Sequence, residues 1–178
     1  MYISILRGIN VSGQKKIKMA DLKSLYEKSG FNQVRTYIQS GNVLFESKIK
    51  DKADIRQTLE TVIENHYGFK VPVDVRTKKD FQAIVKACPY EEAKLAENGT
   101  KILVSFLSRT PTASQRVEME KHAVAPERLI CNKDVIYLFC PNGYGKSKLS
   151  NTFIESKLGL TATTRNWKTV CTLLEMSQ

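Results

Sequence analysis

The side chains best suited to bind a ligand are cations and amides that cluster in short polar strings. Guanidinium, ammonium and amide groups donate hydrogen bonds to phosphate and carboxylate oxygens. These strings fall in loops or at the ends of predicted strands and helices, where binding sites are usually built. They predict a site for an anionic ligand in a basic, loop-lined cleft, with the following candidates: Arg7, Asn10, Lys15, Lys18, Arg35, Gln39, Asn42, Lys146, Lys148, Arg165 and Asn166.

One string resembles a phosphate-binding loop but does not complete its pattern. Residues 142–147 read Asn-Gly-Tyr-Gly-Lys-Ser, between a predicted strand and a predicted helix. The nucleoside-triphosphate motif needs glycine five residues before Gly145, and that position is Cys140. Two alternatives stay open. A helix starting near Ser147 could hold a phosphate with its amides, beside Lys146 and Lys148, or the glycines form a tight turn and Ser147 caps that helix.

A second string, residues 35–42, lies around a predicted hairpin. Arg35, Tyr37 and Gln39 alternate at a spacing of two, so on a continuous strand they would point to one face of the sheet. A cation, a ring and an amide on one face can contact RNA by stacking and hydrogen bonding. The alternative is that Gly41 and Asn42 only supply the backbone freedom of the turn.

The sequence shows no recognisable set of catalytic residues. No nucleophile, base and orienting acid form a recognisable trio. The two histidines, His66 and His122, lie near no cysteine cluster, and the four cysteines form no Cys-x-x-Cys pair. We therefore expect no metal site and no cofactor, and we assign no catalytic residue. The cysteines are interpreted as small buried apolar residues, with a lone catalytic cysteine as the alternative.

The elements that must position these strings follow a repeated order. Apolar spacings of three and four indicate helices, and β-branched or alternating runs indicate strands. In the first half we predict strands at 2–6, 34–38, 42–45 and 71–76, and helices at about 19–29, 51–66 and 79–87. Gly30 and Gly68 stand where the first two helices end.

The second half repeats this order. We predict strands at 101–107, 128–131, 135–140 and 160–164, and helices at about 112–123, 147–158 and 166–176. Asn166 is suited to cap the last helix, and Trp167 is expected to be a packing anchor. Each half therefore reads β-α-β-β-α-β, followed by one more helix.

This order predicts an α+β protein of two tandem ferredoxin-like subdomains, in which two helices cover one face of an antiparallel sheet. We place the first subdomain at residues 1–77, a helix and linker at 78–99, and the second subdomain with its C-terminal helix at 100–178. The alternative is one continuous mixed sheet with flanking helices.

Composition narrows the class of protein. With 178 residues, of which 42% are hydrophobic, the chain can bury a substantial core, and its net charge of +10 favours anionic partners. The longest apolar stretch, residues 135–140, is far shorter than the roughly 20 residues needed to cross a bilayer. We therefore expect no membrane partner. The N-terminal apolar run meets Arg7 at once, without a basic leader, so a cytoplasmic location is expected.

The charge is even between the halves and uneven within them. Residues 1–77 hold 13 basic and 8 acidic residues and residues 78–178 hold 15 and 10, so each part carries +5. Residues 1–20 contain four basic residues and no acidic one, and residues 141–174 contain five basic residues and only Glu155 as an acid. We expect these two stretches to meet in one cleft, although two separate solvated surfaces would explain them equally.

Several strings together resemble a known bacterial family, catalogued as domain of unknown function 1697. They read Leu-Arg-Gly-Ile-Asn-Val at 6–11, Lys-Ile-Lys-Met-Ala-Asp-Leu at 16–22, Arg-Thr-Tyr-Ile-Gln-Ser-Gly-Asn-Val at 35–43, Gly-Lys-Ser-Lys-Leu at 145–149 and Thr-Arg-Asn-Trp at 164–167. The resemblance covers essentially the whole chain. It implies two α+β halves, and no activity or catalytic residue comes with it.

The function predicted from the sequence is binding of an anionic ligand, either a phosphorylated small molecule or a nucleic acid. Two alternatives stay open. One is a protein-interaction or regulatory module without a ligand, and the other is an enzyme that acts on a phosphorylated substrate.

Overall fold

The computed structural model describes all 178 residues, which divide into two compact units. Unit one comprises residues 1–82 and 173–178, and unit two comprises residues 83–172. Each unit is described by itself.

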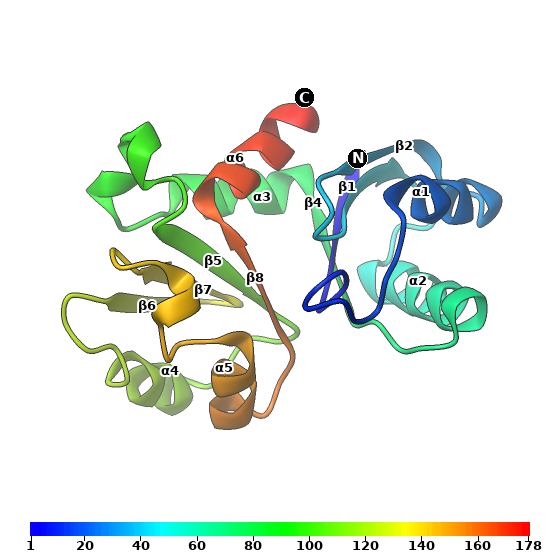
Figure 1. Ribbon diagram of the computed structural model, residues 1–178. Coiled ribbons are helices and arrows are strands. Elements are labelled where there is room, and N and C mark those ends of the chain that lie inside the picture. The colour runs from blue at the N-terminus through cyan, green and yellow to red at the C-terminus, as the bar shows by residue number, and fades with distance from the viewer. The chain divides into compact units, whose positions relative to one another are not determined.

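Unit one is a four-stranded antiparallel sheet with two helices on one face (Figure 1). The strand order is β2-β3-β1-β4. Because β1 and β2 are both antiparallel to β3, they run in the same direction, and β4 runs opposite to them. In chain order the elements are β1 (Tyr2–Leu6), α1 (Met19–Lys28), β2 (Asn32–Tyr37), β3 (Asn42–Glu46), α2 (Lys52–Tyr67) and β4 (Val73–Thr77).

The helix-facing core of unit one is rich in aromatic rings. Phe45 on β3 contacts the rings of Tyr2, Tyr26 and Phe31, with ring centroids 4.9–5.9 Å apart. Aliphatic side chains of α2, among them Leu59, complete this layer. The α2 helix has clear ends, because the Asp51 carboxylate accepts the N–H groups of Ala53 and Asp54, and Gly68 takes the left-handed conformation that ends helices.

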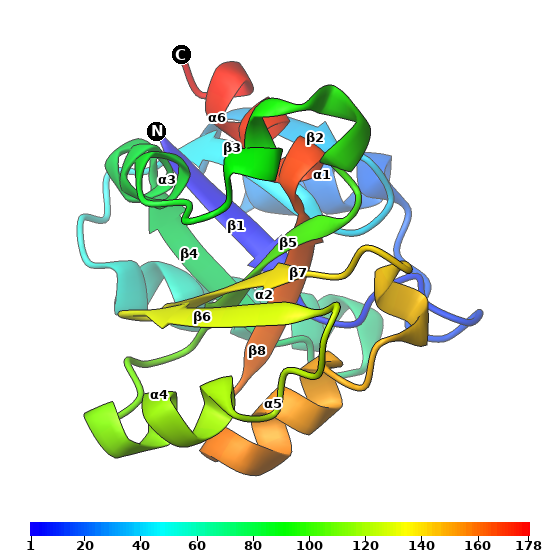
Figure 2. The ribbon, with the colours of Figure 1, turned by 90° about the vertical axis from the view of Figure 1, so that its left-hand side faces the viewer.

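Unit two has the corresponding sheet, in the order β6-β7-β5-β8, with α4 and α5 on one face (Figure 2). Two helices cross the boundary between the units: α3 (Lys78–Lys86) starts in unit one, and the last residues of α6 (Trp167–Met176) belong to unit one. Between them lie η1 (Glu91–Lys94), η2 (Ala96–Asn98), β5 (Ile102–Leu107), α4 (Ala113–Glu120), β6 (Arg128–Asn132), β7 (Val135–Phe139), η3 (Tyr144–Lys146), α5 (Asn151–Leu158) and β8 (Ala162–Asn166).

The helix-facing core of unit two is mostly aliphatic, with residues such as Leu138 and Ile154 packed together. Two buried aromatic side chains of unit two, Tyr137 and Tyr90, lie outside that cluster and are linked by hydrogen bonds. The Tyr137 hydroxyl donates to the Ile84 carbonyl at 2.7 Å, and the Tyr90 hydroxyl donates to the Tyr137 carbonyl at 3.1 Å. These bonds attach the end of α3 and the segment after it to β7.

The mixed α+β class predicted from the sequence is confirmed, and two separate sheets exclude the alternative of one continuous sheet. The helix predicted from residue 147 is wrong at its start. It begins at Asn151, because the Ser150 hydroxyl accepts the Phe153 N–H, while residues 144–146 form a single 3-10 turn. The last strand, predicted at 160–164, lies at 162–166. The two 3-10 helices at 91–94 and 96–98 were not predicted.

No helix combines the length and the apolar character that crossing a bilayer requires.

Candidate functional site: a basic loop end of unit one

Three connections meet at one end of the sheet of unit one. Since β1 and β2 end where β3 and β4 begin, the β1–α1 connection (7–18), the β2–β3 turn (38–41) and the α2–β4 connection (68–72) lie at the same end. We call these three segments the basic loop end. Its basic residues are Arg7, Lys15, Lys16, Lys18 and Lys70, and none of its residues is acidic.

Backbone and side-chain hydrogen bonds lock the three segments together. The Leu6 N–H donates to the Gly41 carbonyl at 2.8 Å, and the Arg7 N–H donates to the Pro72 carbonyl at 2.9 Å. The Lys15 ammonium donates to the Lys70 carbonyl at 2.7 Å. The cations are therefore carried on a connected framework and not on independent loops.

The Asn10 amide is the central link of this framework. Its Nδ2 donates to the carbonyls of Ile17 at 2.9 Å and Gln39 at 2.8 Å, and its Oδ1 accepts the Ile17 N–H at 2.9 Å. Asn10 has a φ of +54°, a left-handed conformation that asparagine tolerates better than most residues. Its amide is thus used to build the site and not to contact a ligand.

Gly41 is required where the β2–β3 turn packs on the first loop. A Cβ at this position would lie 2.7 Å from Ile9 Cδ1 and 2.8 Å from Leu6 Cβ, and its φ is +80°. Ile38, which starts the turn, has a φ of +49° although it is β-branched, and its side chain is 49% exposed. Such a conformation is a strained one for isoleucine. The β2–β3 turn therefore holds a strained residue at this end of the sheet.

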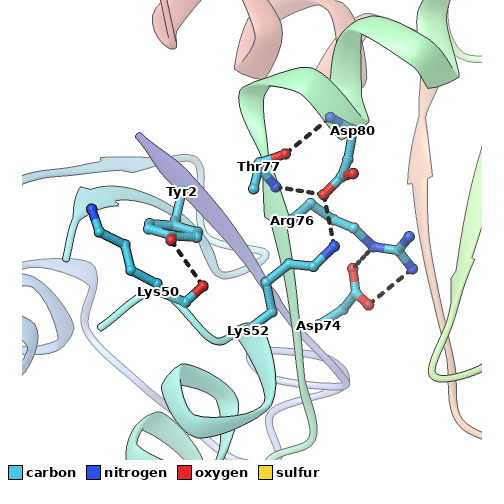
Figure 3. Close-up of polar contacts among 7 residues, drawn as sticks. All are labelled: Tyr2, Lys50, Lys52, Asp74, Arg76, Thr77 and Asp80. Carbon is cyan, nitrogen blue, oxygen red and sulfur yellow. Dashed lines mark hydrogen bonds and ion pairs between the residues drawn. The ribbon is translucent and has the colours of Figure 1, made fainter. Parts of the chain in front are cut away.

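The other end of unit one has a different electrostatic character (Figure 3). There the Lys52 ammonium lies 3.0 Å from the Asp80 carboxylate. Within β4, between the two ends, Arg76 forms a two-pronged pair with Asp74, with N–O distances of 2.7 and 3.1 Å. Burial alone would raise the pKa of Asp80, but the Thr77 N–H and the Lys52 ammonium lower it overall. A carboxylate therefore pairs with the Lys52 cation at this end, in contrast to the acid-free loops at the opposite end.

The candidates in unit two also share one end of their sheet, the end where β5 begins and β7 and β8 end. The Cys140 N–H donates to the Lys101 carbonyl at 2.7 Å, and Asn166 lies opposite Leu103. Lys146 and Lys148 are exposed on the connection that follows β7. Arg165 is 9% exposed, and its Nη1 donates to the Thr164 carbonyl at 2.9 Å.

Comparison with known proteins identifies the family to which the chain belongs. The sequence profile of a family described as a protein of unknown function, DUF1697, matches residues 1–137. The chain belongs to this family. It is also similar to a solved structure described as that of the conserved bacterial protein SP0830 from Streptococcus pneumoniae, with a TM-score of 0.77 and 26% identity over 99% of this chain and 98% of that chain. No curated protein matches the chain.

In this DUF1697 protein, several predicted site residues have structural roles. Asn42, which is fully buried, donates from its amide to the Tyr37 carbonyl and the Ser40 hydroxyl, both at 3.0 Å, and closes the hairpin. Asn166 accepts the Thr169 N–H at 2.8 Å, which confirms it as the cap of α6. Trp167 is 7% exposed, in agreement with a packing anchor.

The predicted common face of Arg35, Tyr37 and Gln39 is not formed. The β2 strand ends at Tyr37 and the left-handed Ile38 breaks the alternation, so Gln39 lies in the turn. Arg35 lies within the strand and donates from Nη2 to the Met176 carbonyl at 2.5 Å. A sheet face for stacking RNA bases therefore has no support in the geometry of β2.

The phosphate-binding helix start near Ser147 is also wrong, because α5 begins four residues later. The Ser147 hydroxyl instead donates to the Glu127 carboxylate at 3.0 Å and accepts the Leu149 N–H at 3.0 Å. Lys146 and Lys148 thus flank a serine whose hydroxyl already makes two hydrogen bonds within the protein.

Of the predicted residues, Arg7, Asn10, Lys15, Lys18 and Gln39 come together at the basic loop end, and Asn42 adjoins it as the first residue of β3. The four candidates after residue 140 belong to unit two. That both sets form one cleft stays a prediction. Sequence reasoning did not name Lys16 as a site residue, although it counted its charge, and it missed Lys70. The β-α-β-β-α-β order could have revealed it, because in that order the connection after the second helix returns to the end where the first strand finishes.

The titratable side chains offer no alternative centre. No group of three or more histidine, cysteine, aspartate or glutamate side chains is arranged to hold a metal ion. Burial raises the pKa of the Cys140 thiol to about 11, and burial followed by the charge of Glu120 raises that of Cys131 to about 12. Both thiols are therefore protonated at neutral pH, which disfavours a nucleophilic role.

Proposed function

We propose that the protein binds a phosphate-bearing ligand at the basic loop end of unit one. One observation carries this proposal: three interlocked connections hold five basic residues and no acidic one. Both a phosphorylated small molecule and a nucleic acid supply the required phosphate oxygens.

The electrostatics support an anion as the ligand. Lys15, Lys16, Lys18 and Lys70 are exposed and Arg7 is half-buried, so their charges reach solvent without a carboxylate in the same segments to neutralise them. Like charges held close together repel one another, and a bound polyanion relieves that repulsion. The hydrogen bonds of Asn10 fix the loops in advance, which reduces the entropy lost on binding.

The test compares two lysines at opposite ends of unit one. Lys16→Gln removes a charge from the basic loop end, and Lys48→Gln removes the same charge from the exposed β3–α2 connection. We expect a panel of nucleotides, phosphorylated sugars and mixed-sequence DNA and RNA to contain ligands that raise the melting temperature saturably. The Lys16 variant should need a higher ligand concentration for the same response, and the Lys48 variant should respond as the unmodified protein does.

The dependence on salt distinguishes the two ligand classes. A nucleic acid should lose affinity by about 0.9 log units per log unit of salt for each duplex phosphate neutralised. A small phosphorylated ligand contacted at one phosphate should show a shallow dependence. No response to any member of the panel, or equal loss in both variants, would contradict the proposal.

We also propose that each unit contains a ferredoxin-like subdomain, with the boundaries 1–77, 78–99 and 100–178 inferred from the sequence. The strand orders β2-β3-β1-β4 and β6-β7-β5-β8, together with the β-α-β-β-α-β element order, support this relation. A cytoplasmic location is proposed as well, supported by four cysteines that form no disulfide.

A further inference from the structure

A narrow finger projects from the basic loop end. The finger consists of residues 10–15, which fold back on themselves as a two-residue hairpin. Val11 and Gln14 form an antiparallel bridge, and the Gln14 N–H donates to the Val11 carbonyl at 2.9 Å. Ser12 and Gly13 both have positive φ, at +49° and +76°, as in the type I′ turns of tight hairpins. In Figure 2 the finger is the blue loop at the right-hand edge.

Hydrogen bonds hold the finger at its base. The Asn10 N–H donates to the Lys15 carbonyl at 3.2 Å, and the Lys15 ammonium is tied to the Lys70 carbonyl. Three of the six non-glycine residues with positive φ lie in it, namely Asn10, Ser12 and Lys15. Three such residues within one short segment are retained only where the surrounding structure holds them in this conformation.

The side chains at the tip differ in kind from those at the base. Val11 is 59% exposed, and Ser12 and Gln14 are exposed beside it. Lys15 and Lys16 follow directly, with Arg7, Lys18 and Lys70 on the segments around them. An apolar group and an amide at the tip, with cations behind them, match base edges flanked by phosphates.

We propose that the finger enters the major groove of double-stranded DNA. Val11 contacts the methyl group of thymine, Gln14 makes hydrogen bonds with the edge of adenine, and the cations of the basic loop end contact phosphates. This inference rests on the proposed function and specifies its ligand class.

The shape of the finger favours DNA over other polyanions. The major groove of B-form DNA, about 12 Å wide, admits a two-stranded ribbon, whereas that of A-form RNA is too narrow. The finger has no aromatic residue, so it lacks the stacking platform typical of single-strand binding. Polar Ser12 and Gln14 at the tip disfavour insertion into lipid.

The experiment measures binding of the full chain to labelled 20-base-pair duplexes by fluorescence anisotropy over a series of salt concentrations. We expect the A·T-rich DNA duplex to bind more tightly than a G·C-rich duplex of equal length, and a matched RNA duplex to bind about tenfold more weakly than DNA. Val11→Ser and Gln14→Ala should lower affinity for the A·T-rich duplex about tenfold without changing the salt slope. Lys16→Gln should reduce that slope by about 0.9.

A chemical change in the DNA sharpens the assignment of Val11. Replacing thymine by deoxyuridine removes the methyl group, and we expect this to weaken binding of the unmodified protein but not of Val11→Ser. Lys48→Gln is the matched charge control and Val124→Ser, at a side chain 73% exposed in unit two, is the matched apolar control. Both should bind as the unmodified protein does.

Three results would overturn the inference: equal affinity for DNA and RNA duplexes, tip variants that bind as the controls do, or binding to phosphatidylglycerol vesicles in place of DNA. If a nucleotide or phosphorylated sugar still raises the melting temperature through Lys16, the proposed function stands and only the DNA inference fails. If no phosphate-bearing ligand is bound, both fail.

Discussion

Unit one and unit two share an element order and a strand order but place their longest connections differently. In unit one the long connection, residues 7–18, follows the first strand, whereas in unit two the long connection, residues 140–150, follows the third. Successive connections lie at alternating ends of such a sheet, so the two loops occupy opposite ends of their own units. The buried strands define the scaffold, and the loops are free to differ in chemistry.

A second contrast lies in the middle of each sheet, where Ser4 of β1 and Ser105 of β5 hold corresponding places and are both fully buried. The Ser4 hydroxyl is bonded to the Tyr26 hydroxyl of α1 at 2.9 Å. The Ser105 hydroxyl is bonded at 2.7 Å to that of Thr164, which also donates to Asn151 at 2.6 Å. The same buried group is thus satisfied by a helix in one unit and by a polar network in the other.

The largest expected effect comes from the aromatic core of unit one. Phe45→Ala removes a fully buried ring that touches three others, and we expect it to lower the free energy of unfolding by about 3–5 kcal/mol. Leu138→Ala, in the aliphatic core of unit two, should cost about 2–5 kcal/mol. Urea denaturation measures both. Equal effects on the near-ultraviolet signal of Trp167, a unit-two residue, would mean that the units unfold as one.

The paired serines come next. Ser4→Ala removes the side-chain partner of the buried Tyr26 hydroxyl, so we expect the free energy of unfolding to fall by about 1–3 kcal/mol. Ser105→Ala should cost less, about 1 kcal/mol, because Thr164 keeps its bond to Asn151. Adding Tyr26→Phe to Ser4→Ala should recover most of the loss, since both polar partners are then absent. Denaturation of the single and double variants tests this, and additive losses would contradict it.

The paired charges at the opposite end of unit one predict a dependence on pH. The pKa of Asp80 is lower in the folded protein than the value near 3.9 expected when unfolded, so its carboxylate stabilises the fold above that value and ceases to do so as the pH falls through the folded pKa. Asp80→Asn should cost about 1 kcal/mol at pH 7, as loss of a helix cap does, and almost nothing near pH 2. A difference that does not shrink on acidification would contradict this.

The smallest effect concerns the two hairpin turns. Ile38 and Lys133 both have positive φ, at +49° and +51°, but only isoleucine is β-branched. Ile38→Asn should raise stability by about 1 kcal/mol, and Lys133→Asn by less. Thermal denaturation compares them. A destabilised Ile38→Asn protein would show that the exposed isoleucine contributes packing that outweighs its strain.

Most elements of the fold were predicted from the sequence, because their signals are local. The apolar spacing of α2 and its ends at Asp51 and Gly68 are readable along the chain, and both are observed. The start of α5 was missed because Ser147 and Ser150 are equally good caps by type. Only the bond between Ser147 and Glu127, a residue 20 positions away, removes the first from that role.

The candidate site was predicted in part. The cations at 7–18 were recognised by charge, which needs no structure. The structural roles of Asn10 and Asn42 were not recognised, because an amide that contacts a ligand and an amide that holds a loop are the same residue type. Lys70 was missed because its neighbours at the basic loop end are distant in sequence, and charge counting along the chain does not bring them together.

The sequence by itself determined the order of strands and helices, the equal charge of the two halves and the polar strings that the family resemblance rests on. These depend on residue type and short-range spacing. The tertiary structure decided that three separate connections share one end of a sheet, that Asn10 and Gly41 lock them, and that a six-residue finger projects from them. Strand order and hydrogen bonds between distant segments produce these features, and neither is written in any single stretch of the chain.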